Sequence, residues 1–160
     1  MFVAAKAQNP PLTVIVTVAH SGYWKQNGNA YDVSLMMGFF ASSNIDYLSP
    51  QLYTQGTEPG NDYTPSNNTW NSAVPWSAWQ SKPTTYTDQY QNVYNYPGCK
   101  PKIAPSIVNA NMYQSAVAAF KVINGSTSVP LTAPPKLTAP ITLSGFIQWS
   151  QAPNTFFQKH

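Results

Sequence analysis

The sequence predicts an α/β fold in which parallel strands alternate with helices. The chain has 160 residues, which is the length of one domain or part of one. Its hydrophobic fraction of 42% can fill a core, and its charged fraction of 8% is too low for disorder driven by self-repulsion. Segments of strand and helix character follow one another along the chain, a pattern that indicates parallel strands joined by right-handed crossovers.

Four segments have the composition of strands. Residues 12–19 are β-branched and almost continuously apolar, which is typical of a strand buried on both faces of a parallel sheet. Residues 45–53 predict a second strand, in which Pro50 removes a ladder donor and indicates a bulge or a local break. Residues 102–109 and 143–150 predict the third and fourth strands.

Helical segments lie between these strands. Residues 2–7 predict the end of a helix, stopped by an Asn-Pro-Pro sequence. Residues 31–43, with Asp32 as the cap, predict a helix of about three turns. Residues 87–95 are weakly helical, and residues 112–123 predict a helix that ends at an Asn-Gly pair.

Two long segments lack a regular pattern. Residues 54–70 predict a loop, and long irregular loops in compact domains are often functional. Residues 126–140 contain four prolines and predict an extended excursion over the surface. Four parallel strands are too few to close a barrel and need cover on both faces. The chain is therefore a fragment, a half-barrel completed by another segment, or a small open α/β layer.

Composition excludes several functions. The net charge of +3 comes from eight scattered lysines against five acidic residues. The chain has no arginine, and this weak, dispersed charge disfavours nucleic-acid binding. No apolar run approaches the length of a membrane-spanning helix. Cys99 is the one cysteine, so an internal disulfide and a multi-cysteine metal site are excluded, and we expect it to pack as a small hydrophobe. No metal-ligand cluster, phosphate-binding glycine loop or Ser-His-Asp order is present, and we expect no cofactor.

The surface composition favours an extracellular, secreted or surface protein. Ser, Thr, Asn and Gln replace charged residues throughout the chain, as in many extracellular proteins that handle sugars. Asn67 and Asn124 begin glycosylation acceptor sequences, which a chain this rich in Asn, Ser and Thr also contains by chance. The first residues do not have the pattern of a signal peptide.

Four sequence segments resemble strands five to eight of the family 18 glycoside hydrolases, the chitinases and chitinase-like proteins. The segments are Leu-Thr-Val-Ile-Val-Thr-Val-Ala (12–19), Asn-Ile-Asp-Tyr-Leu-Ser-Pro-Gln-Leu-Tyr (44–53), Lys-Ile-Ala-Pro-Ser-Ile-Val (102–108) and Ser-Gly-Phe-Ile-Gln-Trp-Ser (144–150). The resemblance covers residues 1–151 and implies a partial (β/α)8 barrel, with residues 152–160 as a tail or the beginning of a final helix.

The sequence departs from this family at the residue that matters most for catalysis. The family's Asp-x-x-Asp-x-Asp-x-Glu run supplies the general acid, and nothing like it occurs here. Glu58 is the one glutamate and lies in a loop rich in Gly and Pro. The region that should carry the run would precede Met1. We therefore expect these 160 residues not to hydrolyse a glycan by the family mechanism, unless a second chain or an amino-terminal segment completes the barrel.

The resemblance also implies a substrate and a set of binding residues. The family hydrolyses β-1,4-linked N-acetylglucosamine by a retaining mechanism in which the sugar's own acetamide attacks the anomeric carbon. Gln51 and Tyr53 match the positions that hold this acetamide, and side chains two apart share a strand face. Trp149 matches the floor of the central sugar subsite. The alternatives are that Gln51 fills a polar layer and that Tyr53 and Trp149 are core aromatics.

Other residues near strand ends are secondary candidates. Asn109 and Asn111 can hydrogen-bond a sugar from the rim. We expect a structural or solvent-facing role for His20, and a capping or pairing role for Asp46 on the strand face opposite the site. Four tryptophans lie in or beside loops, where some extend a sugar groove and most pack against helices; these are Trp24, Trp70, Trp76 and Trp79.

Three functions remain open on the sequence alone. The chain is part of a chitinase-type enzyme whose acid lies elsewhere, a non-catalytic module that binds a chitin-like or peptidoglycan-like glycan, or a structural component of a surface, capsid or extracellular matrix. Of the sugar-binding candidates, Trp24 is the one tryptophan that we assign to the substrate site beside Trp149.

Overall fold

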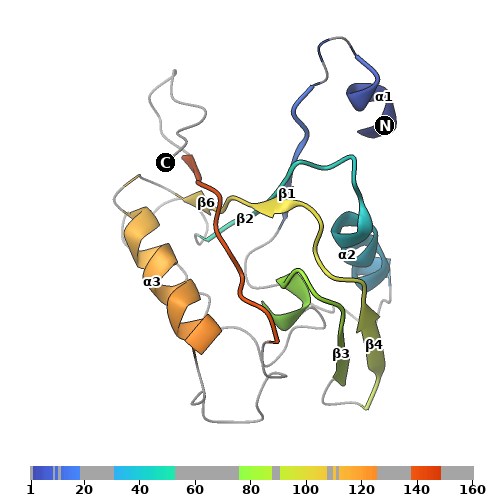
Figure 1. The fold of residues 1–160 in the computed structure, drawn as a ribbon. Helices are drawn as coiled ribbons and strands as arrows, with labels where there is room; N and C mark the ends of the chain where they lie inside the picture. Colours follow the sequence, from blue (N-terminus) through green and yellow to red (C-terminus); the bar gives the residue numbers. More distant parts are fainter. Residues whose placement is uncertain are drawn as a thin grey trace.

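Three small sheets and three α-helices make up the described part of the chain (Figure 1). The computed structural model describes residues 2–8, 10, 12–18, 31–52, 76–87, 91–107, 110, 112–125 and 138–148. One sheet is parallel, with strand order β1-β2-β5, and consists of β1 (Ile15–Val18), β2 (Tyr47–Pro50) and β5 (Lys102–Ile103). A second parallel pair joins β6 (Ser106–Ile107) to β7 (Ile147–Gln148). The third sheet is an antiparallel hairpin of β3 (Thr84–Thr87) and β4 (Val93–Tyr96).

The predicted partial (β/α)8 barrel is wrong. The described strands have only two to four residues each, and they are divided among three sheets. One of these sheets is antiparallel, whereas a piece of a (β/α)8 barrel contains parallel strands alone. The described residues therefore form a small mixed arrangement of α and β elements.

Residues 87–95 were predicted to be weakly helical, and this prediction is wrong, because Thr87 belongs to β3 and Val93–Asn95 belong to β4 of an antiparallel pair. Side chains on these strands alternate between half-buried or buried tyrosines on one face and exposed Thr and Asn on the other. On the exposed face, the Thr85 hydroxyl donates to Asn95 Oδ1 at 2.9 Å. Aromatic, β-branched and threonine side chains suit this half-buried pleated surface better than a helix.

Two prolines explain why the predicted third strand is divided into β5 and β6. On one side of the break, Ala104 N–H donates to Leu48 O at 3.0 Å, and on the other, Leu52 N–H donates to Ser106 O at 2.9 Å. Pro50 lies between these two bonds and has no N–H to donate. Pro105 lies opposite it and interrupts the neighbouring strand in the same way. The predicted break at Pro50 is therefore found only on the β5 side of β2, because Pro50 still pairs with Val18 of β1.

Strand β1 is less buried than its sequence predicts. Val14 and Val18 belong to the core, but Ile15 is 38% exposed and Thr17 is exposed. Ile15 and Thr17 point to one face of the strand and Val14, Val16 and Val18 to the other, so only the second face is turned toward the core. A continuous β-branched run therefore indicates a strand without showing that both of its faces are buried.

Both longer helices were predicted correctly. Helix α2 (Tyr31–Ala41) buries Val33, Met36 and Phe40, spaced as one face of a helix requires. The carbonyl of Phe40 accepts the Lys100 N–H at 2.9 Å near the helix end. Helix α3 (Met112–Gly125) buries Ala116 and Phe120. The short helix α1 (Phe2–Lys6) precedes β1.

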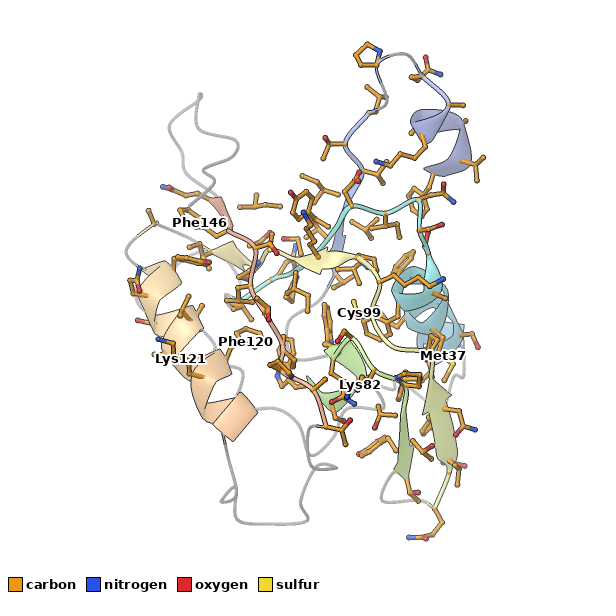
Figure 2. All side chains as sticks on the ribbon, viewed as in Figure 1. Met37, Lys82, Cys99, Phe120, Lys121 and Phe146 are labelled. Carbon is orange, nitrogen blue, oxygen red and sulfur yellow. The ribbon has the colours of Figure 1, made fainter. Side chains whose placement is uncertain are left out.

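A short 3-10 turn, η3 (Trp76–Trp79), lies in the core between the two longer helices. Trp79 contacts Phe40 of α2 with ring centroids 5.2 Å apart, and Trp76 contacts Phe120 of α3 at 5.0 Å. Phe120 points from α3 toward the middle of the molecule (Figure 2). The two indoles are themselves in contact at 5.2 Å, because residues three apart in a 3-10 turn lie on the same side.

The core turn is tied to the chain beyond α3 by Gln80, which is completely buried. Its Oε1 accepts the N–H groups of Thr138 and Ala139, and its Nε2 donates to Thr138 Oγ1 at 3.1 Å. By contrast, Trp76 Nε1, Ser77 Oγ and Trp79 Nε1 are buried and have no hydrogen-bond partner in the described part of the chain. Aromatic packing therefore outweighs the cost of these buried polar atoms, which is about 1–3 kcal/mol for each.

We predict opposite effects for two glycine-to-alanine substitutions. Gly98 has a φ of +84°, and a Cβ there would lie 2.6 Å from the backbone oxygen of Ser81. Gly98→Ala should lower the free energy of unfolding by about 2–3 kcal/mol, because the backbone must move. Gly38, within α2, has nothing within 4 Å of an added Cβ, so Gly38→Ala should raise it by up to about 1 kcal/mol. Urea unfolding of both variants measures the difference, and equal midpoints would contradict the prediction.

Candidate functional site

The carboxyl ends of β1 and β2 meet the beginning of β6 around Gln51. Its backbone N–H donates to Val18 O of β1 at 2.9 Å. The next residue, Leu52, donates its N–H to Ser106 O of β6 at 2.9 Å. In this way the end of β2 is held between β1 and β6. In parallel α/β sheets, ligands bind outside the carboxyl ends of the strands, so this edge is the candidate site.

A pair of serines forms a buried polar layer beneath Gln51. Ser49 Oγ and Ser106 Oγ are hydrogen-bonded at 2.7 Å, and both residues are completely buried. Gln51 pairs with Ser106 through an isolated parallel bridge, and it shares a strand face with Ser49 because the two are two residues apart. Gln51 itself is partly exposed. Its amide is therefore in a position to bind a ligand.

A one-residue bulge decides which side chains of β7 face this layer. Bridges join Ile103 to Leu143 and Ser106 to Ile147, so the second strand has one residue more than the first between them. Gly145 lies in this stretch with a φ of +125°, as expected where a strand contains a bulge. As a result, Ile147 shares the face of Ser106 and Gln51, whereas Gln148 pairs with Ile107 on the other face.

Most of the predicted sugar-binding residues lie outside the described residues. Gln51 is the one that the structure places, at the end of β2. The residues outside are Tyr53, Trp149, Asn109 and Trp24, together with Asn111, His20, Trp70 and Glu58. In sequence, Tyr53 follows Gln51 by two residues, Asn109 follows β6 by two, and Trp149 follows β7 directly.

Trp76 and Trp79 are core residues rather than groove residues. Trp76 is 2% exposed and Trp79 is 1% exposed. Their rings contact Phe120, Phe40 and each other. The sequence placed both tryptophans beside a loop and left their role open, and the structure assigns them to packing.

Asp46 has the structural role that the sequence predicts. Its Oδ2 accepts the Val14 N–H at 2.7 Å and forms an ion pair with Lys6 Nζ. Its backbone N–H donates to Val14 O, and its carbonyl accepts the Lys102 N–H, both at 2.9 Å. The hydrogen bond from Lys6, helped by the Val14 N–H and the charge of Lys102, holds the pKa of Asp46 below its ordinary value. The carboxylate thus joins α1 to the chain before β1, and the backbone of Asp46 adds the link to β5.

We predict that Asp46 makes the fold sensitive to acid. Because its folded pKa is lowered, the ionised form stabilises the fold fully above the ordinary aspartate pKa of about 3.9, and this stabilisation is lost as the pH falls through the lower folded value. Asp46→Asn should therefore lower the Tm at pH 7, by an amount equivalent to about 1 kcal/mol for a partly exposed pair. Thermal unfolding of both proteins between pH 7 and pH 2.5 measures this, and a difference in Tm that is the same at both ends would contradict it.

Cys99 packs as a small hydrophobe, as predicted. It is a free cysteine, it is buried, and its thiol donates to Pro101 O at 3.4 Å. Burial raises the pKa of the thiol to about 12. The reactive thiolate is therefore scarce at neutral pH, and Cys99 does not contribute a nucleophile.

Metal-binding and membrane-spanning features are not found in the part of the chain that the structure describes. No group of three or more His, Cys, Asp or Glu side chains there is placed to hold a metal ion. None of the helices within those ranges has both the length and the apolar character needed to cross a bilayer.

The serine layer is the part of the site that the sequence analysis missed. Ser49 and Ser106 are small hydroxyl residues within otherwise apolar strand segments, and each is flanked by proline. A serine within an apolar strand segment was the sequence feature that could have indicated the pair, because a buried hydroxyl needs a hydrogen-bond partner. The sequence does not show that the two residues are partners, since they are 57 positions apart.

No protein-family model, curated protein or solved structure matches this chain. The physical arrangement around Gln51 is therefore the basis for a functional proposal.

Proposed function

We propose that this chain is a carbohydrate-binding, chitinase-like protein that binds β-1,4-linked N-acetylglucosamine polymers at the carboxyl ends of β1 and β2, beside β6, without cleaving them. The observation that carries the proposal is the partly exposed amide of Gln51, beside Ser106 and above the buried Ser49–Ser106 pair. The proposal includes an extracellular or surface location, in keeping with the amide-rich and hydroxyl-rich composition.

The chemistry of a glutamine side chain suits an acetamido sugar. A primary amide has two donors and an acceptor oxygen, so Gln51 can donate to the acetamide oxygen and accept from its N–H at the same time. Neither partner is charged, so binding avoids the large cost of burying an unpaired ion. The Ser49–Ser106 hydrogen bond holds β2 and β6 together below the amide, which limits the conformational entropy lost on binding.

The resemblance in sequence adds further residues to the proposed site. Tyr53, Asn109, Trp149 and Trp24 are the candidates, and their sequence positions after or between the strands suit a site at strand ends. An indole or phenol ring can cover the apolar face of a pyranose while the amides bind its polar substituents.

We predict that Gln51→Ala weakens binding of soluble tetra-N-acetylchitotetraose about 5-fold, because one hydrogen bond contributes about 1 kcal/mol. Isothermal titration calorimetry on the purified chain measures the affinity. Gln148→Ala is the matched control, since Gln148 is also a partly exposed amide at a strand end but lies on the other face. It should bind within about 2-fold of the unaltered chain.

Two results would contradict the proposal for Gln51. One is the absence of any heat of binding for the unaltered chain at millimolar oligosaccharide. The other is an equal loss of affinity in Gln51→Ala and Gln148→Ala, which would show that the amide at position 51 has no special role.

We further predict that the purified chain releases no detectable product from a fluorogenic chitobiose substrate. Hydrolysis needs a carboxylic acid to protonate the leaving oxygen. Asp46 cannot serve, because its pKa is lowered by Lys6 and it lies on the strand face opposite Gln51. Any hydrolysis would need an acid from another segment or a second chain. Turnover comparable to that of a complete chitinase would refute this prediction.

A further inference from the structure

Strand β1 forms one edge of the β1-β2-β5 sheet among the described strands. Val14 O and Val18 O accept N–H groups from β2 and from the residue after it, at 3.2 and 2.9 Å. Successive residues of a strand turn their main-chain groups to alternate sides. The N–H and C=O groups of Ile15 and Thr17 therefore point away from β2, toward the side of β1 on which the sheet has no further described strand.

The side chains of this edge are also open to a partner. Ile15 is 38% exposed and Thr17 is exposed. Leu12, shortly before the strand, is 55% exposed. Val14 and Val18 point to the opposite face and belong to the core. The edge strand is thus fixed by its buried face, while its other face carries β-branched side chains at the surface.

The edge lacks the features that usually prevent one strand from adding to another. Native sheets protect their edges with charged side chains, prolines or bulges. Residues 12–18 contain no charged residue, no proline and no glycine, and β1 pairs with β2 in an unbroken register of four residues. Lys6, the basic residue before β1 in the sequence, forms an ion pair with Asp46. The edge of β1 is therefore regular and uncharged.

The opposite edge of the same sheet is protected. Lys102 is exposed at the beginning of β5, and Pro101 and Pro105 flank this strand. The carbonyl of Ile103 accepts the Ser144 N–H at 2.8 Å, so the segment before β7 covers this side. Of the two edges of the sheet, the edge of β1 is the one suited to a further strand.

We propose that the free edge of β1 pairs with the same edge of a second copy of this chain, as antiparallel strands related by a two-fold axis at Val16. In an antiparallel ladder, residues two apart on one strand both bond to the other strand. Ile15 and Thr17 have this spacing. Ile15 therefore exchanges two hydrogen bonds with Thr17 of the partner subunit, and Thr17 does the same with the partner's Ile15.

A second copy fits this edge because the edge is complementary to itself. Each copy brings the same two donors and two acceptors, so a closed pair leaves none of these four groups unpaired. Each cross-strand pair joins a β-branched isoleucine to a β-branched threonine, a favourable combination in a sheet. No like charges face each other across the axis, since residues 12–18 are uncharged. The interface does not rest on the proposed glycan site.

The mass of the full chain in solution tests this interface. Analytical ultracentrifugation covers about 10 μM to about 1 mM protein, because a small interface associates weakly. The weight-average mass of the unaltered chain should rise toward twice the monomer mass. Ile15→Lys with Thr17→Lys sets lysine opposite lysine in both pairs and should raise the concentration of half-association about 10-fold or more.

A charge-reversed variant tests the register. Ile15→Glu with Thr17→Glu should weaken association as the lysine variant does. An equimolar mixture of the two variants sets lysine opposite glutamate and should restore a dimer. A mixture that stays monomeric would overturn the antiparallel pairing.

A matched control changes the same number of charges elsewhere. Leu35→Lys with Val93→Lys alters two exposed apolar residues of α2 and β4 and should leave association unchanged. Circular dichroism and urea unfolding verify that each variant is folded. If the variants at Ile15 do not fold, Thr17→Lys alone replaces them, because this side chain is exposed; it should weaken association about 3-fold.

Amide hydrogen exchange by NMR gives a second measurement on the unaltered chain. The amides of Ile15 and Thr17 should exchange more slowly at high protein concentration than at low concentration. The amides of Val16 and Val18, which face β2, should be protected at both. A chain that stays monomeric up to 1 mM overturns the proposal, as does a dimer that persists in the folded lysine variant or is lost in the control. Concentration-dependent protection of Ile15 and Thr17 together with restoration in the mixture supports it.

Discussion

The aromatic contacts of the Trp76–Trp79 turn are the interaction on which the rest of the described structure depends. Through Trp79 the turn contacts Phe40 of α2, and through Trp76 it contacts Phe120 of α3. Gln80, the next residue, binds the backbone of the segment that leads toward β7. Phe40 also contacts Tyr96, so the hairpin depends on the same cluster. The strands are only two to four residues long, and short strands need such packing to be stable.

The proposed binding site lies where this packing ends. At the strand ends, the buried Ser49–Ser106 pair lies next to Gln51, which is partly exposed. On the hairpin, by contrast, the stacked rings of Tyr86, Tyr94 and Tyr96 pack against the core. At the strand ends, the side chain that is proposed to bind a ligand is held by neighbours that are completely buried. Rigid support of this kind lowers the entropic cost of binding.

Local patterns predicted the elements whose stability is local. The helices at residues 31–43 and 112–123 were predicted from apolar spacing, and the break at Pro50 from the missing N–H. The hairpin at residues 84–96 was missed because its alternation of tyrosine with Thr and Asn is short and was taken for a weak helix. The partial barrel was wrong because order along the chain does not determine how strands divide among sheets. Within the candidate site, Gln51 was predicted, whereas the serine layer was not.

The sequence by itself determined a weakly charged, amide-rich and aromatic chain with one glutamate, one cysteine and alternating strand and helix segments. Composition is a sum over the residues, and the segments are short-range patterns, so both are determined by the sequence without the tertiary structure. Only the tertiary structure decided that Ser49 bonds to Ser106, that Asp46 pairs with Lys6, and that three tyrosines form a row. Ser49 and Ser106 are 57 residues apart in the sequence, and Asp46 and Lys6 are 40 residues apart. Contacts over such separations depend on how the whole chain packs, which no local pattern contains.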